Sequence, residues 1–351
     1  MNITEKYLGN LSQDSIFLYT LVNDNNINIS ILSYGGTIME IALPDKETGL
    51  RTITLTLKNW EDYIHNPLYP GSSLGPNAGR IRKGEMTIGS NTYQLSQNDG
   101  RHHLHGGVSS VSYQNWILKE QIKGKNFVSL TLSTVLTDGQ EGYPGNREIS
   151  ASYTLDNAGR FVIQYSGISD RDTYFNLSNH TYFNLSGLNT SGLSQILTIN
   201  ANTYIANSEE HLPLQFLPVE NSPFDFVSPV SLKDNLESYP NHPQTIIARG
   251  YNNGFDIRDA ALHNVPAVTL WDLAHTTGLK LYTNAPCLVL YSGGFIGSEY
   301  RLKNNTPTHI SCAIALEAQD FPDALHFGEG SDGITLKGER YQRKIVYEFL
   351  Y

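Results

Sequence analysis

Apolar residues alternate with polar ones in short runs along the whole chain. This period of two sends successive side chains of a strand to opposite faces, one toward a core and the other toward solvent or a cleft. The apolar members of these runs are Ile27, Ile29 and Ile31; Ile53, Leu55 and Leu57; Val128, Leu130 and Leu132; and Leu279 and Leu281. Helical periodicity is scarce, with one short helix predicted at residues 57–65. The pattern therefore predicts an all-β protein.

Turn signals separate the alternating runs, with Asn-Asp-Gly at 98–100, Tyr-Pro-Gly at 143–145 and Asn-Asn-Gly at 252–254. Many short strands without a βαβ rhythm predict a large antiparallel sandwich. The sequence contains no linker, low-complexity tract or convincing repeat. Its length of 351 residues is compatible with one large β domain, since β sandwiches and barrels often exceed about 200 residues as a single unit. We therefore expect one domain over residues 1–351.

The composition excludes several classes of partner. The net charge of −10 and the lack of any Lys/Arg run argue against a nucleic-acid partner. The N-terminal residues show no apolar signal-peptide segment, and no apolar stretch is long enough to span a bilayer. Cys287 and Cys312 are too few for a disulfide framework, and their apolar surroundings predict buried, inert thiols. We expect a soluble cytoplasmic protein without a membrane partner; the sequence does not predict its oligomeric state.

Four clusters place ionisable groups among glycines, amides and aromatics. In the first, Gly75-Pro-Asn-Ala-Gly-Arg-Ile81, Arg80 is the one cation. Its guanidinium is a rigid fork of donors suited to vicinal hydroxyls or to a carboxylate. The alternative, which the residues alone favour, is an ordinary arginine in a surface turn.

The second cluster is Asn-Asp-Gly-Arg-His-His-Leu-His-Gly-Gly at residues 98–107. In an extended segment His103 and His105 point the same way, as two metal ligands on a strand would, so a cupin-like metal site is one interpretation. Such a site needs further ligands at recognisable spacing. The alternative is that His102 and His103 are exposed loop residues. The two glycines after His105 predict that a bulky group approaches the backbone there.

The third cluster, Asn-Leu-Ser-Asn-His-Thr-Tyr-Phe-Asn-Leu-Ser-Gly at 176–187, surrounds His180 with amides, hydroxyls and aromatics. Amides bind sugar hydroxyls, aromatics stack on sugar faces, and a histidine donates a proton near neutral pH. The structural alternative is a histidine hydrogen-bonded in the core. In the fourth cluster, Glu317 directly follows the apolar run Ala-Ile-Ala-Leu, where an ionised carboxylate is costly unless it is paired or functional. Glu317 is therefore the best catalytic candidate, with a buried salt-bridge partner as the alternative.

Together these clusters resemble the galactose mutarotase family of aldose 1-epimerases, and they occur in the order of that family. Residues 75–84 are similar to its early glycine/arginine motif, and Leu-His-Gly-Gly at 104–107 to its first histidine motif. Asn-His-Thr-Tyr-Phe-Asn-Leu at 179–185 resembles the second histidine motif. Leu-Glu-Ala-Gln at 316–319 with Pro-Asp-Ala at 322–324 resembles the glutamate motif, and residues 139–145 resemble a family turn. The likeness spans most of the chain.

The resemblance implies a large antiparallel β-supersandwich whose concave face binds a free monosaccharide, and an isomerase that interconverts its α and β anomers. It implies that Glu317 is the general base at the anomeric hydroxyl and His180 the general acid at the ring oxygen. His105 would assist at the ring oxygen and Arg80 would bind a sugar hydroxyl. It implies no metal and no organic cofactor. Since the reaction runs both ways, we expect pKa values near neutrality for Glu317 and His180.

One position departs from the family pattern. Asn252 stands where the family usually carries an aspartate that binds a sugar hydroxyl. An amide keeps the hydrogen bond but lacks the strength that a charge adds, so we expect Asn252 to alter sugar preference. Gly79 likewise stands where some relatives carry asparagine.

Two other functions compete with this interpretation. A non-catalytic carbohydrate-binding protein on the same scaffold is compatible with Asn252, whereas the presence of both Glu317 and His180 argues against it. A glycoside hydrolase normally needs two carboxylates flanking the bond, and Glu317 has only Asp320 and Asp323 nearby in the sequence.

Overall fold

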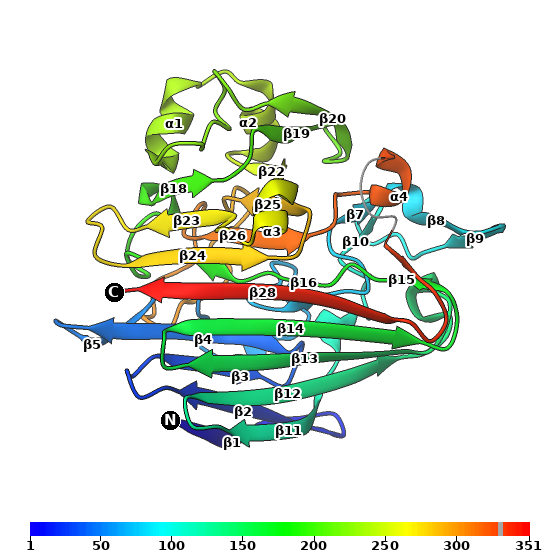
Figure 1. Cartoon of the computed structure of the whole chain (residues 1–351), viewed down its shortest axis with the longest axis horizontal. Coiled ribbons are helices and arrows are strands. Elements are labelled where there is room, and N and C mark those ends of the chain that lie inside the picture. Colours follow the sequence, from blue (N-terminus) through cyan, green and yellow to red (C-terminus); the bar gives the residue numbers. More distant parts are fainter. Residues whose placement is uncertain (329–332) are drawn as a thin grey trace.

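The computed structural model describes residues 1–328 and 333–351, which form antiparallel sheets (Figure 1). The largest sheet has nine strands, which are, in spatial order, β11 (Ile117–Lys123), β12 (Phe127–Leu136), β13 (Arg147–Asp156), β14 (Arg160–Ser169), β28 (Arg340–Leu350), β24 (Gly278–Thr283), β23 (Val268–Trp271), β18 (Ile196–Ile199) and β21 (Val230–Ser231). A five-stranded sheet contains β1 (Asn2–Leu11), β2 (Asp14–Val22), β3 (Asn28–Leu32), β4 (Thr37–Asp45) and β5 (Gly49–Thr52).

The third large sheet has six strands, which are, in order, β17 (Tyr182–Phe183), β26 (Ile314–Gln319), β25 (Cys287–Tyr291), β22 (Asn252–Asp256), β19 (Thr203–Asn207) and β20 (Pro213–Pro218). Four two-stranded pairs join β10 (His103–Leu104) to β7 (Arg80–Ile81), β15 (Thr173–Tyr174) to β27 (Ile334–Thr335), β16 (Ser178–Asn179) to β6 (Ser73–Leu74), and β8 (Glu85–Ile88) to β9 (Asn91–Gln94).

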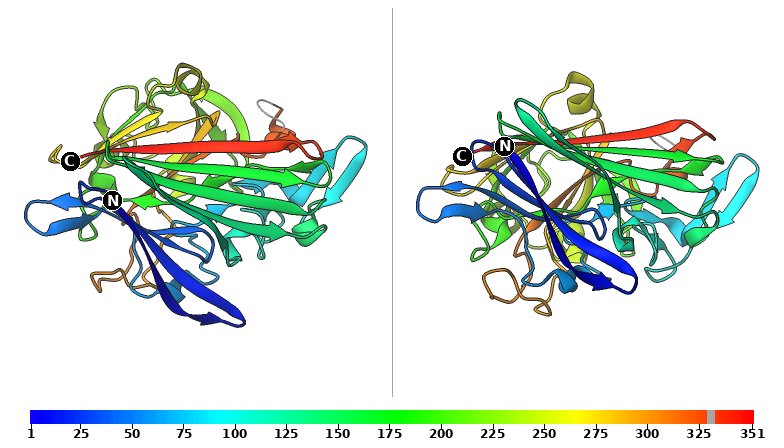
Figure 2. Two further views of the ribbon diagram at one scale, coloured as in Figure 1. Left: turned by 60° about the horizontal axis from the view of Figure 1, so that its bottom comes forward. Right: turned by 90° about the horizontal axis from the view of Figure 1, so that it is seen from below.

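The three large sheets share one hydrophobic core, so the predicted all-β sandwich is confirmed. In Figure 2 the blue strands of the five-stranded sheet form a layer that crosses the green and red strands of the nine-stranded sheet. The predicted alternation places its apolar residues in this core, as in β3 (Ile29, Ile31), β12 (Val128, Leu130, Leu132) and β24 (Leu279, Leu281). Full burial of such a side chain stabilises the fold by about 1.5–3 kcal/mol, so many alternating positions together specify the register.

Short helices occur mostly where the sequence did not predict them. The helix expected at 57–65 is a single 3₁₀ turn at Trp60–Tyr63. The α-helices are α1 (Leu232–Ser238), α2 (Pro243–Ala248), α3 (Arg258–His263) and α4 (Ala324–Phe327). The further 3₁₀ helices span Arg82–Gly84, Val111–Tyr113, Gln140–Gly142 and Gly192–Ser194. At seven residues or fewer, none of the α-helices is long enough to show a helical period, so the prediction of almost no other helix was wrong. No helix of the described residues is long and apolar enough to cross a membrane.

The turn predicted at 252–254 is also wrong, because these residues begin strand β22. Gly254 serves close packing there: a Cβ at this position would lie 2.9 Å from the Cys287 Sγ atom. Cys287 and Cys312 are free and buried, as predicted, and burial raises the pKa of both thiols.

Strand β26 carries the alternation that matters most for function. Leu316 and Ala318 belong to the core shared with the nine-stranded sheet. Glu317 and Gln319 therefore face the other side of the six-stranded sheet, where they line a pocket. A slip of one residue would turn Glu317 into the core, so hydrophobic burial of its neighbours aims the carboxyl group into the pocket.

Candidate active site

Glu317 and His180 meet in the pocket although they are 137 positions apart in the chain. The His180 Nε2 atom lies 3.5 Å from the Glu317 Oε1 atom, and each residue is 4% exposed. His180 stands between β16 and β17, where its backbone N–H donates to the Ser72 carbonyl and its carbonyl accepts from the Gly71 N–H. These bonds hold the backbone of His180, whose imidazole reaches Glu317 of β26.

The second histidine of the pocket, His105, is held by an irregular backbone. Its φ angle is +49°, and Gly106 follows with a φ of +82°. A Cβ on Gly106 would lie 2.1 Å from the Gly75 carbonyl oxygen, and one on Gly107 would lie 2.0 Å from Oε2 of the Glu141 side chain, which confirms that a bulky group approaches the backbone there. The Gly79 N–H donates to His105 Nδ1 at 3.1 Å. Nε2 therefore carries the proton of the neutral ring and is a hydrogen-bond donor.

The pairing of His103 with His105 as metal ligands on one strand is wrong. Because His105 has a left-handed backbone, the two side chains diverge. His103 packs in a separate cluster, where its Nε2 atom is 2.9 Å from the Tyr143 hydroxyl and its Nδ1 atom 2.7 Å from the Ser96 carbonyl. The prediction of exposed loop histidines is wrong too, since His102 and His103 are both buried.

A different set of residues offers a metal-sized cluster of ligand atoms. One atom each of His105, His180 and Glu317 lies within 4.8 Å of the other two. Imidazole and carboxylate are ligands that suit zinc and related ions. Imidazole and carboxyl groups can also donate and accept protons, so the cluster is compatible with acid/base chemistry as well.

All five residues predicted for the site, Arg80, His105, His180, Asn252 and Glu317, line this one pocket, a cavity of about 190 Å³. The Arg80 guanidinium is held by Asp99, with 2.6 Å between Nε and Oδ2, so it is oriented at the pocket rather than free in a surface turn. Asn252 lies at the start of β22, and its backbone carbonyl accepts from Asn207 Nδ2.

Sequence reasoning missed other residues that line the pocket, among them Tyr69, Asn207, His211, Tyr291, Phe295 and Gln319. Gln319 could have been predicted, because it follows Glu317 by two positions on the same strand and so lies on the same face. No local pattern marks Asn207 or His211, because only the pairing of β19 with β22 brings that segment to the pocket.

Buried polar atoms without a partner gather in this pocket. Among the described residues, His180 Nδ1, Asn207 Oδ1, His211 Nδ1 and both amide atoms of Gln319 are buried and accept or donate no hydrogen bond. Native proteins satisfy nearly all buried polar groups, so a concentration of exceptions marks a place where a ligand supplies the partners. A polyhydroxylated ligand suits this set, because a hydroxyl group both donates and accepts.

Burial controls the protonation of the central pair. It raises the pKa of Glu317 to about 8, with Arg80 acting in the opposite direction, and lowers the pKa of His180 to about 4. The carboxyl group thus titrates near neutrality as expected, whereas the His180 pKa is lower than expected. Between these values the pair holds a single proton.

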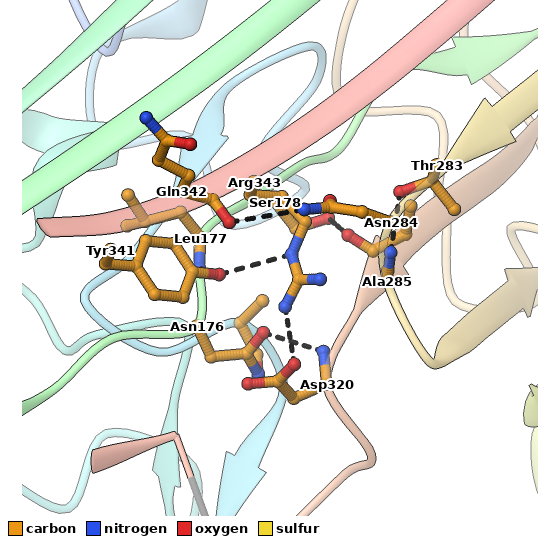
Figure 3. A network of polar contacts seen from close by, with 12 residues as sticks. Asn176, Leu177, Ser178, Thr283, Asn284, Ala285, Asp320, Tyr341, Gln342 and Arg343 are labelled. Carbon is orange, nitrogen blue, oxygen red and sulfur yellow. Dashed lines mark hydrogen bonds and ion pairs between the residues drawn. The ribbon is translucent and has the colours of Figure 1, made fainter. Parts of the chain in front are cut away.

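The two carboxylates considered for a hydrolase, Asp320 and Asp323, form ion pairs and do not line the pocket. Figure 3 shows Asp320, one residue beyond β26, in an ion pair with Arg343 of β28, and its backbone N–H donating to Asn176 Oδ1 at 2.8 Å. Asp323 is paired with Arg82 and His326. Glu317 is the only carboxylate among the described residues that line the pocket, so the two-carboxylate arrangement is not formed.

These groups are equipped to move protons on a neutral, polyhydroxylated ligand, which places the protein among the acid/base enzymes that act on carbohydrates. The sequence profile of the aldose 1-epimerase family matches residues 18–348, and the chain belongs to that family. Members of the family are isomerases.

Individual relatives resemble the chain over nearly their whole length. The aldose 1-epimerase of Haemophilus influenzae is 31% identical over 339 residues, which cover 95% of each chain. The galactose mutarotase of Mus musculus is 28% identical over 330 residues, covering 93% of this chain and 92% of that one. The crystal structure of galactose 1-epimerase from Lactobacillus acidophilus superposes with a TM-score of 0.88 at 28% identity, covering 99% of this chain and 98% of that one.

Proposed function

We propose that the protein opens and recloses the ring of a free aldohexose, with Glu317 as general base and His180 as general acid. The observation that carries these roles is the buried Glu317–His180 contact of 3.5 Å in a pocket of unpartnered polar groups. Arg80 and Asn252 bind sugar hydroxyls, and the His105 Nε2–H donates toward the ring oxygen.

The proton balance of the reaction matches this pair. In the reacting tautomer the shared proton lies on His180. Glu317, then a carboxylate, removes the proton of the anomeric hydroxyl, and the C1–ring-oxygen bond breaks while the His180 imidazolium protonates the ring oxygen. The open-chain aldehyde rotates about its C1–C2 bond, and the reverse transfers close the ring on either face. The pair carries one proton before and after ring opening. After opening both side chains are neutral, which is the distribution that burial favours.

The substrate we propose is galactose or glucose, because two of the relatives described above are named for galactose and because the pocket presents neutral amide and imidazole groups rather than a cluster of cations. We further propose that the chain acts as one domain in the cytoplasm, without metal, cofactor, nucleic-acid or membrane partner. The net charge of −10 and the two buried free thiols support this setting.

Polarimetry tests the proposal directly. Freshly dissolved α-D-galactose and α-D-glucose should approach their unchanged equilibrium rotations faster when the purified protein is added, and the two rates rank the sugars. No acceleration with either sugar, together with measurable sugar binding, would instead support the non-catalytic binding protein.

A further inference from the structure

Gln319 is the most completely unpartnered buried side chain of the pocket. It is the last residue of β26 and is 1% exposed. Both of its amide atoms, Nε2 and Oε1, lack a hydrogen-bond partner among the described residues. Because it follows Glu317 by two positions in the strand, its side chain lies on the same face, and both residues line the pocket.

Another buried glutamine of the protein has hydrogen-bond partners for its amide group. Gln195 is fully buried, and its Oε1 atom accepts from the Leu185 N–H while Nε2 donates to the Phe183 and Gly192 carbonyls. A buried amide without such partners destabilises the folded state, since it has lost its bonds to water. The contrast indicates that Gln319 is kept for a ligand rather than for the fold.

Gly79 leaves room for the Gln319 amide. A Cβ at position 79 would lie 3.1 Å from Gln319 Nε2, so a side chain there would force the amide to shift by a few tenths of an ångström. The separation of the two segments is fixed by Asn176, which accepts from the Asp320 N–H and donates through Nδ2 to the Ala78 carbonyl at 3.0 Å. Figure 3 shows this contact at the Asp320 backbone and the ion pair of the Asp320 carboxylate with Arg343.

We propose that Gln319 is a substrate-binding residue whose amide exchanges hydrogen bonds with a sugar hydroxyl, and that Gly79 keeps the space for that amide open. The proposal rests on the sugar chemistry of the proposed function. Adjacent same-face positions on a strand are about 7 Å apart, so with Glu317 at the anomeric hydroxyl, Gln319 contacts a hydroxyl away from the reacting bond. Gln319 therefore contributes to binding and sugar selection and leaves the proton transfers to Glu317 and His180.

The Gln319→Leu variant separates binding from folding. It should raise KM by about 5- to 30-fold with a much smaller change in kcat, since one or two hydrogen bonds to the sugar are lost. It should also raise the thermal midpoint by about 1–3 °C, because an unpartnered buried amide is removed. The matched control, Gln195→Leu, should do the reverse: a lower midpoint and an unchanged KM. An unchanged KM in Gln319→Leu refutes the proposal.

Monodeoxy sugars identify the hydroxyl. In the wild-type protein one monodeoxyhexose should lose kcat/KM relative to the parent sugar, and that loss should vanish in Gln319→Leu. Persistence of every deoxy penalty in the variant would contradict the contact, and Gln319→Met provides the same comparison if the leucine variant does not fold. If the wild-type protein accelerates no sugar, the proposed function fails. Calorimetric sugar binding to both proteins then tests Gln319 by itself: equal affinities refute its role, and weaker binding by the variant supports it.

Discussion

Replacing Glu317 by glutamine removes the proposed base while keeping the shape of the pocket. The amide fills the same buried position beside His180 Nε2 and cannot take up a proton. One of the two proton transfers is thereby lost, and a positioned transfer is worth ~10²–10⁴ in rate. The expected loss in kcat is therefore of that size, equivalent to about 3–5 kcal/mol of transition-state stabilisation. Sugar affinity should change little, because the other binding groups remain.

The same variant has a predictable effect on stability. Because burial raises the folded-state pKa of Glu317 to about 8, the folded protein retains a proton that the unfolded chain releases near its ordinary pKa of 4.5. Stability should therefore fall as pH rises through this window, by up to a few kcal/mol, and Glu317→Gln should remove that dependence. Urea unfolding at several pH values measures the effect.

Polarimetry under initial-rate conditions and calorimetric sugar binding are the assays for the catalytic part. Glu348→Gln, the same substitution on the outer strand surface of β28, is the matched control and should retain wild-type rates. If Glu317→Gln keeps more than about a tenth of the wild-type kcat, the general-base role is refuted. If it loses sugar binding in parallel with rate, Glu317 acts in binding rather than in proton transfer.

Three further results are expected. The pH profile of kcat should fall below about 4, where His180 and Glu317 are both protonated, and above about 8, where the pair has lost its proton; a flat profile across either limit would contradict the shared-proton scheme. Asn252→Asp should change the ratio of kcat/KM between galactose and glucose more than it changes kcat, and identical kinetics on several aldoses would exclude Asn252 from sugar selection. Arg343→Met should lower the free energy of unfolding by about 3–5 kcal/mol, since Asp320 stays buried without its guanidinium; a loss below 1 kcal/mol in urea unfolding would refute this.

The fold class and the candidacy of Glu317 as a functional carboxylate were predictable because their signals are local. The alternation of apolar residues directly reports which side of a strand is buried, and a glutamate in register with such a run is either paired or functional. The other site residues, Arg80, His105, His180 and Asn252, were predicted from the resemblance to the family, whose motifs occur in the same order in this chain. Helices α1–α4 were missed because so few residues cannot display a period of 3.6, and the turn at 252–254 because a glycine signal does not distinguish a turn from close packing.

By itself, the sequence determined the antiparallel β architecture and the presence of a carboxylate, two histidines and an arginine in motifs of one family, with an asparagine where that family usually has an aspartate. Only the tertiary structure decided which of them meet. The left-handed backbone of His105 separates it from His103 and turns it toward His180. Pairing of β26 with β17 and of β16 with β6 brings His180 to Glu317. Such contacts depend on pairings between segments far apart in the chain, which no short-range pattern encodes. The unpartnered amide of Gln319 likewise became visible only once its surroundings were known.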